Sequence, residues 1–186
     1  PMTVWSAQAS GPPETMWPED IEGPASKKNE MRLAGQAAGV NFPDTLVIEG
    51  KYRCRPPFPF SPGGEAAGGD SEVGEKVSHL KVGDRVMCRG GAGWAEYAVA
   101  NWRRAVPMGD ADIPWDQAQC VQGALQTMHH AIVTNGGLGQ GQQALFECAS
   151  SGAGVLGVSC RREMAAQSVG WQARLSGVPP RSAGLR

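Results

Sequence analysis

The chain has 186 residues, of which 41% are hydrophobic and 19% charged, and its formal net charge is −1 at pH 7. This length holds one good hydrophobic core, or one domain and part of a second. The near-neutral charge gives no electrostatic basis for binding nucleic acid or an anionic membrane surface, and we expect neither partner. No apolar stretch approaches the ~20 residues that a membrane-spanning helix needs.

The five cysteines are odd in number and form no C-x-x-C pair. This pattern disfavours both a structural zinc site of the common spacing and a disulfide framework. Reduced thiols are typical of the cytoplasm, and the first residues lack the basic and then apolar build of a secretory signal. We therefore expect a cytoplasmic protein. The cysteines are Cys54, Cys88, Cys120, Cys148 and Cys160.

The first third of the chain consists of short strand-like pieces separated by turns. Residues 1–30 predict one or two marginal strands, and residues 31–37 alternate as a half-buried strand does. A Pro-Asp pair within residues 41–52 is typical of a helix start, so this segment predicts a short helix and a loop. Residues 53–64 are rich in proline and predict an irregular loop.

Three further strands are predicted at residues 71–73, 85–88 and 94–99, and their spacing favours a small, partly open β barrel. Residues 68–70 (Gly-Gly-Asp) are expected to weaken one barrel strand. Residues 90–93 contain three glycines and predict a hairpin turn.

Beyond residue 115 the spacing of apolar residues becomes helical. Steps of three and four predict a helix over residues 115–135, and residues 144–146 predict a buried strand. Residues 149–157 then favour a phosphate-binding turn, because glycines let the backbone approach a pyrophosphate and the next helix offers unpaired N–H groups. An ordinary Ser/Gly loop is the alternative interpretation. From about residue 159 the period is lost, which predicts an irregular tail.

The glycine turn is followed by little chain. Only 29 residues follow Gly157, whereas one βαβ unit alone takes about 30 residues. The sequence therefore predicts a cofactor domain that is begun and not finished, through truncation or a shifted reading frame. Glu147, at the end of the strand before the turn, is expected to be costly there unless it is paired or protonated.

Five motifs, in order along residues 28–158, resemble those of the medium-chain dehydrogenase/reductase superfamily, specifically its zinc-free quinone oxidoreductase branch. A lone glycine turn is weak evidence, but five motifs in the correct order are strong evidence. The motifs are residues 37–44 (AAGVNFPD), 63–68 (GGEAAG, followed by Gly74 and Val77), 82–86 (VGDRV), 94–97 (WAEY) and 149–157 (ASSGAGVLG).

The resemblance implies a mixed β and α/β fold. A GroES-like, partly open β barrel is expected over residues 1–118, followed by an incomplete Rossmann-type nucleotide-binding domain over residues 119–186. It also implies the absence of zinc, because Asn41 and Gly64 stand where zinc-dependent relatives carry a cysteine and a histidine. Full-length relatives can form homodimers, but the edge they use is expected to be missing, so we do not expect a homodimer.

The implied activity is hydride transfer from NADPH to a quinone or an activated enone or carbonyl. By resemblance, Asn41 lies near the nicotinamide and the substrate, where it can donate to a carbonyl that gains negative charge. Tyr52 aligns with a pocket tyrosine, and Thr127 with a residue that supports the nicotinamide amide. The other cofactor contacts are expected from the turn, at Ala149, Ser151, Gly152, Ala153, Gly154 and Val155.

Simpler roles remain open for these residues. Asn41 is also a good helix cap, Tyr52 can pack in its loop, and Glu65 is typical of a structural carboxylate that holds a loop. Arg174 follows the turn by about 20 residues without a nearby acid, which favours NADPH over NADH only weakly. We expect the chain as given to be weakly active or inactive, and the competing hypothesis is a non-catalytic barrel or interaction module.

Overall fold

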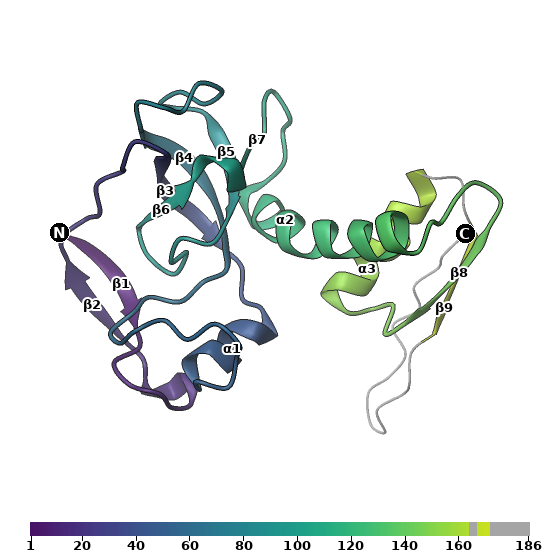
Figure 1. Cartoon of the computed structure of the whole chain (residues 1–186), viewed down its shortest axis with the longest axis horizontal. Coiled ribbons are helices and arrows are strands. Elements are labelled where there is room, and N and C mark those ends of the chain that lie inside the picture. Colours follow the sequence, from purple (N-terminus) through teal and green to yellow (C-terminus); the bar gives the residue numbers. More distant parts are fainter. Residues whose placement is uncertain (164–166, 172–186) are drawn as a thin grey trace. The chain divides into compact units, whose positions relative to one another are not determined.

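In a computed structural model of the chain, residues 1–163 and 167–171 are described. The chain divides into two compact units, residues 1–123 and 124–186, and each is described here by itself (Figure 1). Helix α2 (Trp115–His129) contains the division between the units. The domain boundary expected between residues 118 and 119 also falls inside this helix.

The first unit is built on a five-stranded antiparallel sheet in the order β6-β3-β4-β5-β7 (Figure 1). A separate antiparallel pair, β1 and β2, is linked to the rest by isolated bridges between Val4 and Ala95 and between Ala7 and Phe60. This curled sheet confirms the small β domain that the strand spacing predicted. The strands are β1 (Met2–Ser6), β2 (Trp17–Ile21), β3 (Glu30–Ala38), β4 (Glu65–Val73), β5 (Arg85–Arg89), β6 (Tyr97–Asn101) and β7 (Ala105–Pro107). Short helices are η1 (Pro13–Thr15), α1 (Phe42–Ile48) and η2 (Trp102–Arg104).

Two apolar clusters form because successive strand residues point to opposite faces of the sheet. Ala66 belongs to the larger cluster, and its neighbour Ala67 belongs to the smaller one. Ala118, in the first turn of α2, closes the smaller cluster together with Met108. The larger cluster consists of Met31, Leu33, Ala66, Leu80, Val86, Cys88, Ala100 and Ala105. Each fully buried Leu, Val or Met side chain stabilises the fold by about 1.5–3 kcal/mol.

Strand β4 continues through Gly68, Gly69 and Asp70, where the sequence predicted a weakened strand. It pairs with β3 on one side and with β5 on the other, so its backbone is held from both sides. A side chain at Gly68 would meet the carbonyl oxygen of Ala34 on β3. Close packing against a neighbouring strand therefore requires glycine here, and tertiary context overrides the weak strand propensity.

Residues 90–93 do not form the predicted hairpin turn. The strands that they connect, β5 and β6, are separated in the sheet by β3 and β4. Gly91 has a φ of +93°, and a side chain there would meet the carbonyl oxygen of Val99. The glycines thus belong to a connection that passes from β5 across the sheet to the edge strand β6. The sequence did not distinguish this connection from a hairpin.

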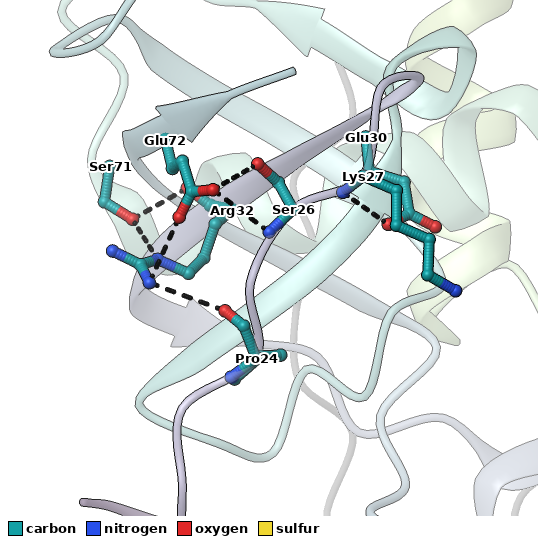
Figure 2. A network of polar contacts seen from close by, with 7 residues as sticks. All are labelled: Pro24, Ser26, Lys27, Glu30, Arg32, Ser71 and Glu72. Carbon is teal, nitrogen blue, oxygen red and sulfur yellow. Dashed lines mark hydrogen bonds and ion pairs between the residues drawn. The ribbon is translucent and has the colours of Figure 1, made fainter.

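A polar network ties the segment before β3 to strand β4 (Figure 2). The Arg32 guanidinium lies 3.2 Å from the Glu72 carboxylate and donates to Ser71 Oγ at 3.1 Å and to the Pro24 carbonyl at 3.4 Å. Glu72 also accepts from the hydroxyl and the backbone N–H of Ser26, at 2.7 and 3.2 Å. The Ser26 hydroxyl is the main cause of the lowered pKa of Glu72. Because both charged groups are partly exposed, the network fixes the path of the chain more than it adds stability.

The described part of the second unit is a βαβ element. Strands β8 (Gln143–Glu147) and β9 (Gln167–Trp171) are parallel, and helix α3 (Gly152–Glu163) makes the crossover that parallel strands need. Before it, α2 is followed by the π-helical segment η3 (His130–Asn135). The irregular tail predicted from about residue 159 does not begin there, since α3 runs to Glu163 and a strand follows.

Candidate active site

Asn41 lies between β3 and α1, at the N-cap of the helix. The Asp44 carboxylate accepts from the backbone N–H of Asn41 at 2.8 Å and from that of Gly64 at 3.1 Å. Asn41 and Asp44 thus form a capping box. The Asp44 N–H also donates to the Asn41 backbone carbonyl at 2.9 Å. Burial raises the pKa of Asp44, against the lowering effect of the two backbone hydrogen bonds.

The side-chain amide of Asn41 is bonded to a buried carboxylate. Its Nδ2 donates to Glu65 Oε1 at 2.7 Å, and Glu65 is only 3% exposed. The second carboxylate oxygen, Oε2, accepts from the backbone N–H of Gly123 in α2 at 2.9 Å. Glu65 therefore connects the β3–α1 segment to helix α2 within the first unit. This geometry agrees with the structural role that the sequence favoured for Glu65.

Two glycines make room for this carboxylate. A side chain at Gly39 would meet Glu65 Oε1, and it would lie 2.6 Å from Gln119 Oε1. A side chain at Gly123 would meet Glu65 Oε2. The position of Gly39 is fixed further, because its N–H donates to the Glu65 backbone carbonyl at 3.1 Å and its own carbonyl accepts from Trp94 Nε1 at 2.9 Å.

Tyr52, the second predicted catalytic residue, is half-buried in the loop after α1. Its backbone N–H donates to the Leu46 carbonyl at 3.1 Å, and the Arg53 guanidinium lies 5.9 Å from the centre of its ring. Asn41 and Tyr52 thus flank opposite ends of α1, a helix about 10 Å long. The structure does not join them in one hydrogen-bond network among the contacts described.

An apolar hollow of about 440 Å³ opens beside the Asn41 segment, and Val40, the residue before Asn41, contributes to its wall. Indole rings and a thioether make a surface that suits a flat, uncharged ring better than a charged group. The Trp94 ring is held in place by its hydrogen bond to Gly39. The lining residues are Trp5, Met16, Ala38, Val40 and Trp94.

Asn41 and Gly64, which stand at the positions of the zinc ligands in zinc-dependent relatives, make other hydrogen bonds in this structure. Asn41 binds Glu65 through its amide, and the Gly64 N–H donates to Asp44. Neither residue has a thiolate or an imidazole to offer. Within residues 1–163 and 167–171, no three His, Cys, Asp or Glu side chains gather as a metal site.

The glycine turn joins β8 to α3 in the second unit. Cys148 has a φ of +54° and turns the chain at the end of β8. Ser151 caps the helix, since its Oγ accepts from the backbone N–H of Gly154 at 3.0 Å. A side chain at Gly154 would meet the Cys148 carbonyl oxygen, and the Ala149 Cα at 2.9 Å. The start of α3 can therefore approach the end of β8 only because Gly154 has no side chain.

The other two glycines of the Gly-x-Gly-x-x-Gly run have different surroundings. A side chain at Gly152 would meet no described residue within 4 Å, so this part of the structure leaves the backbone open to an approaching group. At Gly157 it would lie 2.5 Å from Met128 and 2.8 Å from Phe146, so helix and strand pack closely at that point. A tight turn, an open approach and a close helix–strand contact are the features of a pyrophosphate-binding turn, and the residues present fit a dinucleotide.

Three further expectations concern the second unit. Glu147 is exposed, so the predicted cost of a buried glutamate does not arise, and this prediction was wrong. Thr127 lies on an exposed face of α2. Arg174, which carried the preference for NADPH, lies outside the described residues.

Residues 27–110 match the family model for the alcohol dehydrogenase GroES-like domain. Over 136 residues the chain is 34% identical to the quinone oxidoreductase-like protein 2 homolog of Nematostella vectensis, covering 70% of this chain and 36% of that protein. Its structure is similar to that of Escherichia coli quinone oxidoreductase complexed with NADPH, with a TM-score of 0.78 and 26% identity, over 90% of this chain and 52% of that one. The chain belongs to the medium-chain dehydrogenase/reductase superfamily.

This superfamily member spans about half or less of the length of these relatives. It is also 33% identical over 141 residues to the polyketide synthase GfsB of Streptomyces halstedii, covering 76% of this chain and 2% of that protein. The GroES-like barrel and the quinone oxidoreductase-like membership expected from the ordered motifs are confirmed. No helix in the described ranges has both the length and the apolar character to cross a membrane.

The sequence did not identify Gly39 and Gly123 as parts of the site. The G-x-E-x-x-G motif drew attention to Glu65, but Gly123 follows Glu65 by 58 residues and belongs to a helix rather than to a motif. Gly39 was visible only as one member of the segment 37–44. The shared signal, a glycine facing a carboxylate, exists only in the folded chain.

Proposed function

We propose that this superfamily member binds NADPH at its glycine turn and takes part in hydride transfer to a quinone or an activated enone or carbonyl, without zinc. The observation that carries this proposal is that Gly152, Gly154 and Gly157 together provide an open backbone, a tight turn and a close helix–strand contact, with the first two roles exchanged between Gly152 and Gly154 relative to the usual dinucleotide turn. The quinone oxidoreductase relatives support a quinone-type acceptor, and the NADPH complex of the Escherichia coli protein supports that cofactor. When bound, NADPH supplies the hydride.

The residues of the glycine turn bind the phosphates in this proposal. The N–H groups at the start of α3 face an anion, and the positive end of the helix dipole adds to the attraction. Ser151 holds this end of the helix in place through its bond to Gly154. Thr127 supports the nicotinamide amide, and the remaining contacts come from Ala149, Ala153 and Val155.

Asn41 orients the acceptor. The amide nitrogen carries two N–H bonds, of which one is used by Glu65. The second donates to the acceptor oxygen, where negative charge develops during hydride transfer. Tyr52 is a second donor or a ring wall, and the apolar hollow beside Val40 takes the ring of a quinone.

An activated enone is the alternative acceptor. It presents the same carbonyl oxygen to Asn41 and gains the same negative charge. The match to a polyketide synthase supports this class. We further propose that the protein is cytoplasmic and that this chain does not form the homodimer of its full-length relatives.

Calorimetric titration with NADPH tests the cofactor site. We expect micromolar binding that Gly154→Asp abolishes, because the new carboxylate collides with the end of β8 and repels phosphate. Gly23→Asp is the matched control, since it adds the same charge where nothing lies within 4 Å. No heat at millimolar NADPH contradicts the proposal and favours the non-catalytic barrel or interaction module. Oxidation of NADPH by 1,4-naphthoquinone or by an enone then separates the two acceptor classes.

A further inference from the structure

We propose that Glu65 is a positioning residue that sets the orientation of the Asn41 amide. The inference rests on the proposed function, because that function assigns Asn41 to the acceptor. Glu65 is placed to act through Asn41 and not on the acceptor itself, since it is 3% exposed and its two oxygens are both occupied by donors.

Two donors converge on this carboxylate from different elements. Asn41 Nδ2 reaches Oε1 at 2.7 Å from the N-cap of α1, and the Gly123 N–H reaches Oε2 at 2.9 Å from α2. A carboxylate accepts at both oxygens, whereas an amide of the same shape has one acceptor and one donor. Hydrogen bonds to an ionised acceptor are roughly twice as strong as bonds between neutral groups. The pair of bonds therefore selects a carboxylate at position 65.

The neighbouring residues confine the Glu65 carboxylate to one position. A side chain at Gly39 or at Gly123 would collide with one of its oxygens, so the glycines define the space that it fills. Gln119 approaches the same space with Oε1, a buried acceptor without a described partner, while its Nε2 donates to the Asp116 carbonyl at 3.0 Å. The Gln119 amide nitrogen is thus engaged with Asp116, and among the described contacts Gln119 donates no hydrogen bond to Glu65 that could replace that of Asn41.

The orientation of Asn41 follows from these acceptors. If the Asn41 amide turned over, its Oδ1 would face Glu65 Oε1, the charge-assisted bond would be lost and two acceptors would repel each other. Glu65 therefore keeps the nitrogen side of the amide toward the carboxylate and leaves the second N–H for the acceptor. Without Glu65, only the capping contact between the Asn41 side-chain oxygen and the Asp44 N–H still favours this orientation, and the turned-over amide, which presents no donor, becomes more populated.

Nuclear magnetic resonance of the full chain tests the geometry without relying on activity. In the unmodified chain, we expect one of the two Asn41 side-chain protons to exchange with water more slowly than the other. In Glu65→Gln, we expect the Asn41 side-chain resonances to shift and this difference to disappear. Equal exchange of the two protons in the unmodified chain, which needs no variant to fold, overturns the proposal.

The kinetic test is a double-mutant cycle on NADPH-dependent quinone reduction. We expect Glu65→Gln to lower kcat by about tenfold and to leave the KM for NADPH nearly unchanged, as expected for the loss of one oriented charge-assisted bond. In an Asn41→Ala background, the same change should have little further effect, because Glu65 acts through Asn41. Additive losses overturn the proposal. If the unmodified chain reduces no quinone, the proposed function fails, while the resonance measurement still decides the role of Glu65.

Asp70→Asn is the matched control. Asp70 lies on the same strand as Glu65 and is equally buried, at 3% exposure, but neither of its carboxyl oxygens bonds to a described residue. We expect this variant to leave the Asn41 resonances and the kinetic parameters unchanged. If Asp70→Asn shifts them as Glu65→Gln does, the effect is a general response to replacing a buried carboxyl group on β4 and the proposal is wrong.

Discussion

Asp70 is a carboxylic acid inside the barrel of the first unit. It follows Ala66 and Gly68 at two-residue steps and therefore lies on the same face of β4 as the larger apolar cluster. Burial, and to a smaller extent the nearby charge of Asp84, raises the pKa of Asp70 to about 7. The same burial raises the pKa of the neighbouring Cys88 thiol to about 11. Asp70 is thus protonated at a pH where an exposed aspartate is fully charged.

This shift predicts that the barrel loses stability as the pH rises. The folded chain keeps the Asp70 proton up to about pH 7, whereas the unfolded chain releases it near pH 3.8. The stabilisation is fully present below pH 3.8 and is lost as the pH rises through about 7. Over about three pH units this loss is on the order of 4 kcal/mol. Urea unfolding between about pH 4 and about pH 8 measures it.

Asp70→Val should flatten this pH dependence, because an apolar side chain replaces the buried acid. Asp110→Asn is the control, since Asp110 is exposed. The pKa of Asp44 is also raised by burial, so Asp44 adds a slope of the same sign that both variants keep. A steep slope that persists in Asp70→Val contradicts the prediction.

At the scale of elements, α1 depends on its capping box. Asp44→Ala removes the acceptor for the N–H groups of Asn41 and Gly64. We expect a loss of about 1–2 kcal/mol in the free energy of unfolding, measured with urea. Thr45→Ala, in the same helix, removes only an exposed hydroxyl bond to Phe42 and should cost much less. Equal losses in the two variants would show that the box is not what stabilises α1.

The periodic elements could be predicted from the sequence, and their pairing could not. Alternation along residues 31–37 and helical spacing over 115–135 found β3 and α2, because side-chain period follows directly from backbone geometry. The crossing from β5 to β6 escaped prediction, since glycines permit a hairpin and a crossover equally well. The C-terminal part of helix α3 was not predicted, because Arg161 and Arg162 interrupt the apolar period. A helix that has already formed can continue through such residues.

The candidate site was predictable as a set of residues but not as a network. Asn41 and the glycine turn were found from motifs, whose local spacing the sequence displays. The bond from Gly123 to Glu65 joins residues 58 positions apart, and the sequence holds no local trace of it. The sequence placed Asp70 in a segment expected to weaken a strand. That its buried carboxyl oxygens bond to no described residue depends on the packing of the whole barrel.

For the molecule as a whole, the exposed apolar side chains predict association. Val40 and Phe42 are each 75% exposed, at the start of α1 and beside the apolar hollow. Large apolar side chains exposed two residues apart in the sequence favour self-association or aggregation. We expect the sedimentation coefficient of the chain to rise with concentration, and the double variant Val40→Ser, Phe42→Ser to reduce this rise. Val82→Ser, at a side chain 65% exposed elsewhere in the unit, is the control; an equal reduction in the control contradicts a specific patch.

The space around the Glu65 carboxylate also couples the side chains that positions 39, 65 and 123 can hold. A side chain at Gly123 collides with Glu65 alone, and this collision disappears once residue 65 is shortened, whereas a side chain at Gly39 would also lie 2.6 Å from Gln119 Oε1. A substitution at Gly123 is thus tolerated only after Glu65 has been replaced by a shorter residue, and the reverse order introduces a collision. A chain that keeps Glu65 must therefore keep both glycines, and a chain that loses Glu65 can gain a side chain at position 123 but not at position 39 unless Gln119 also moves.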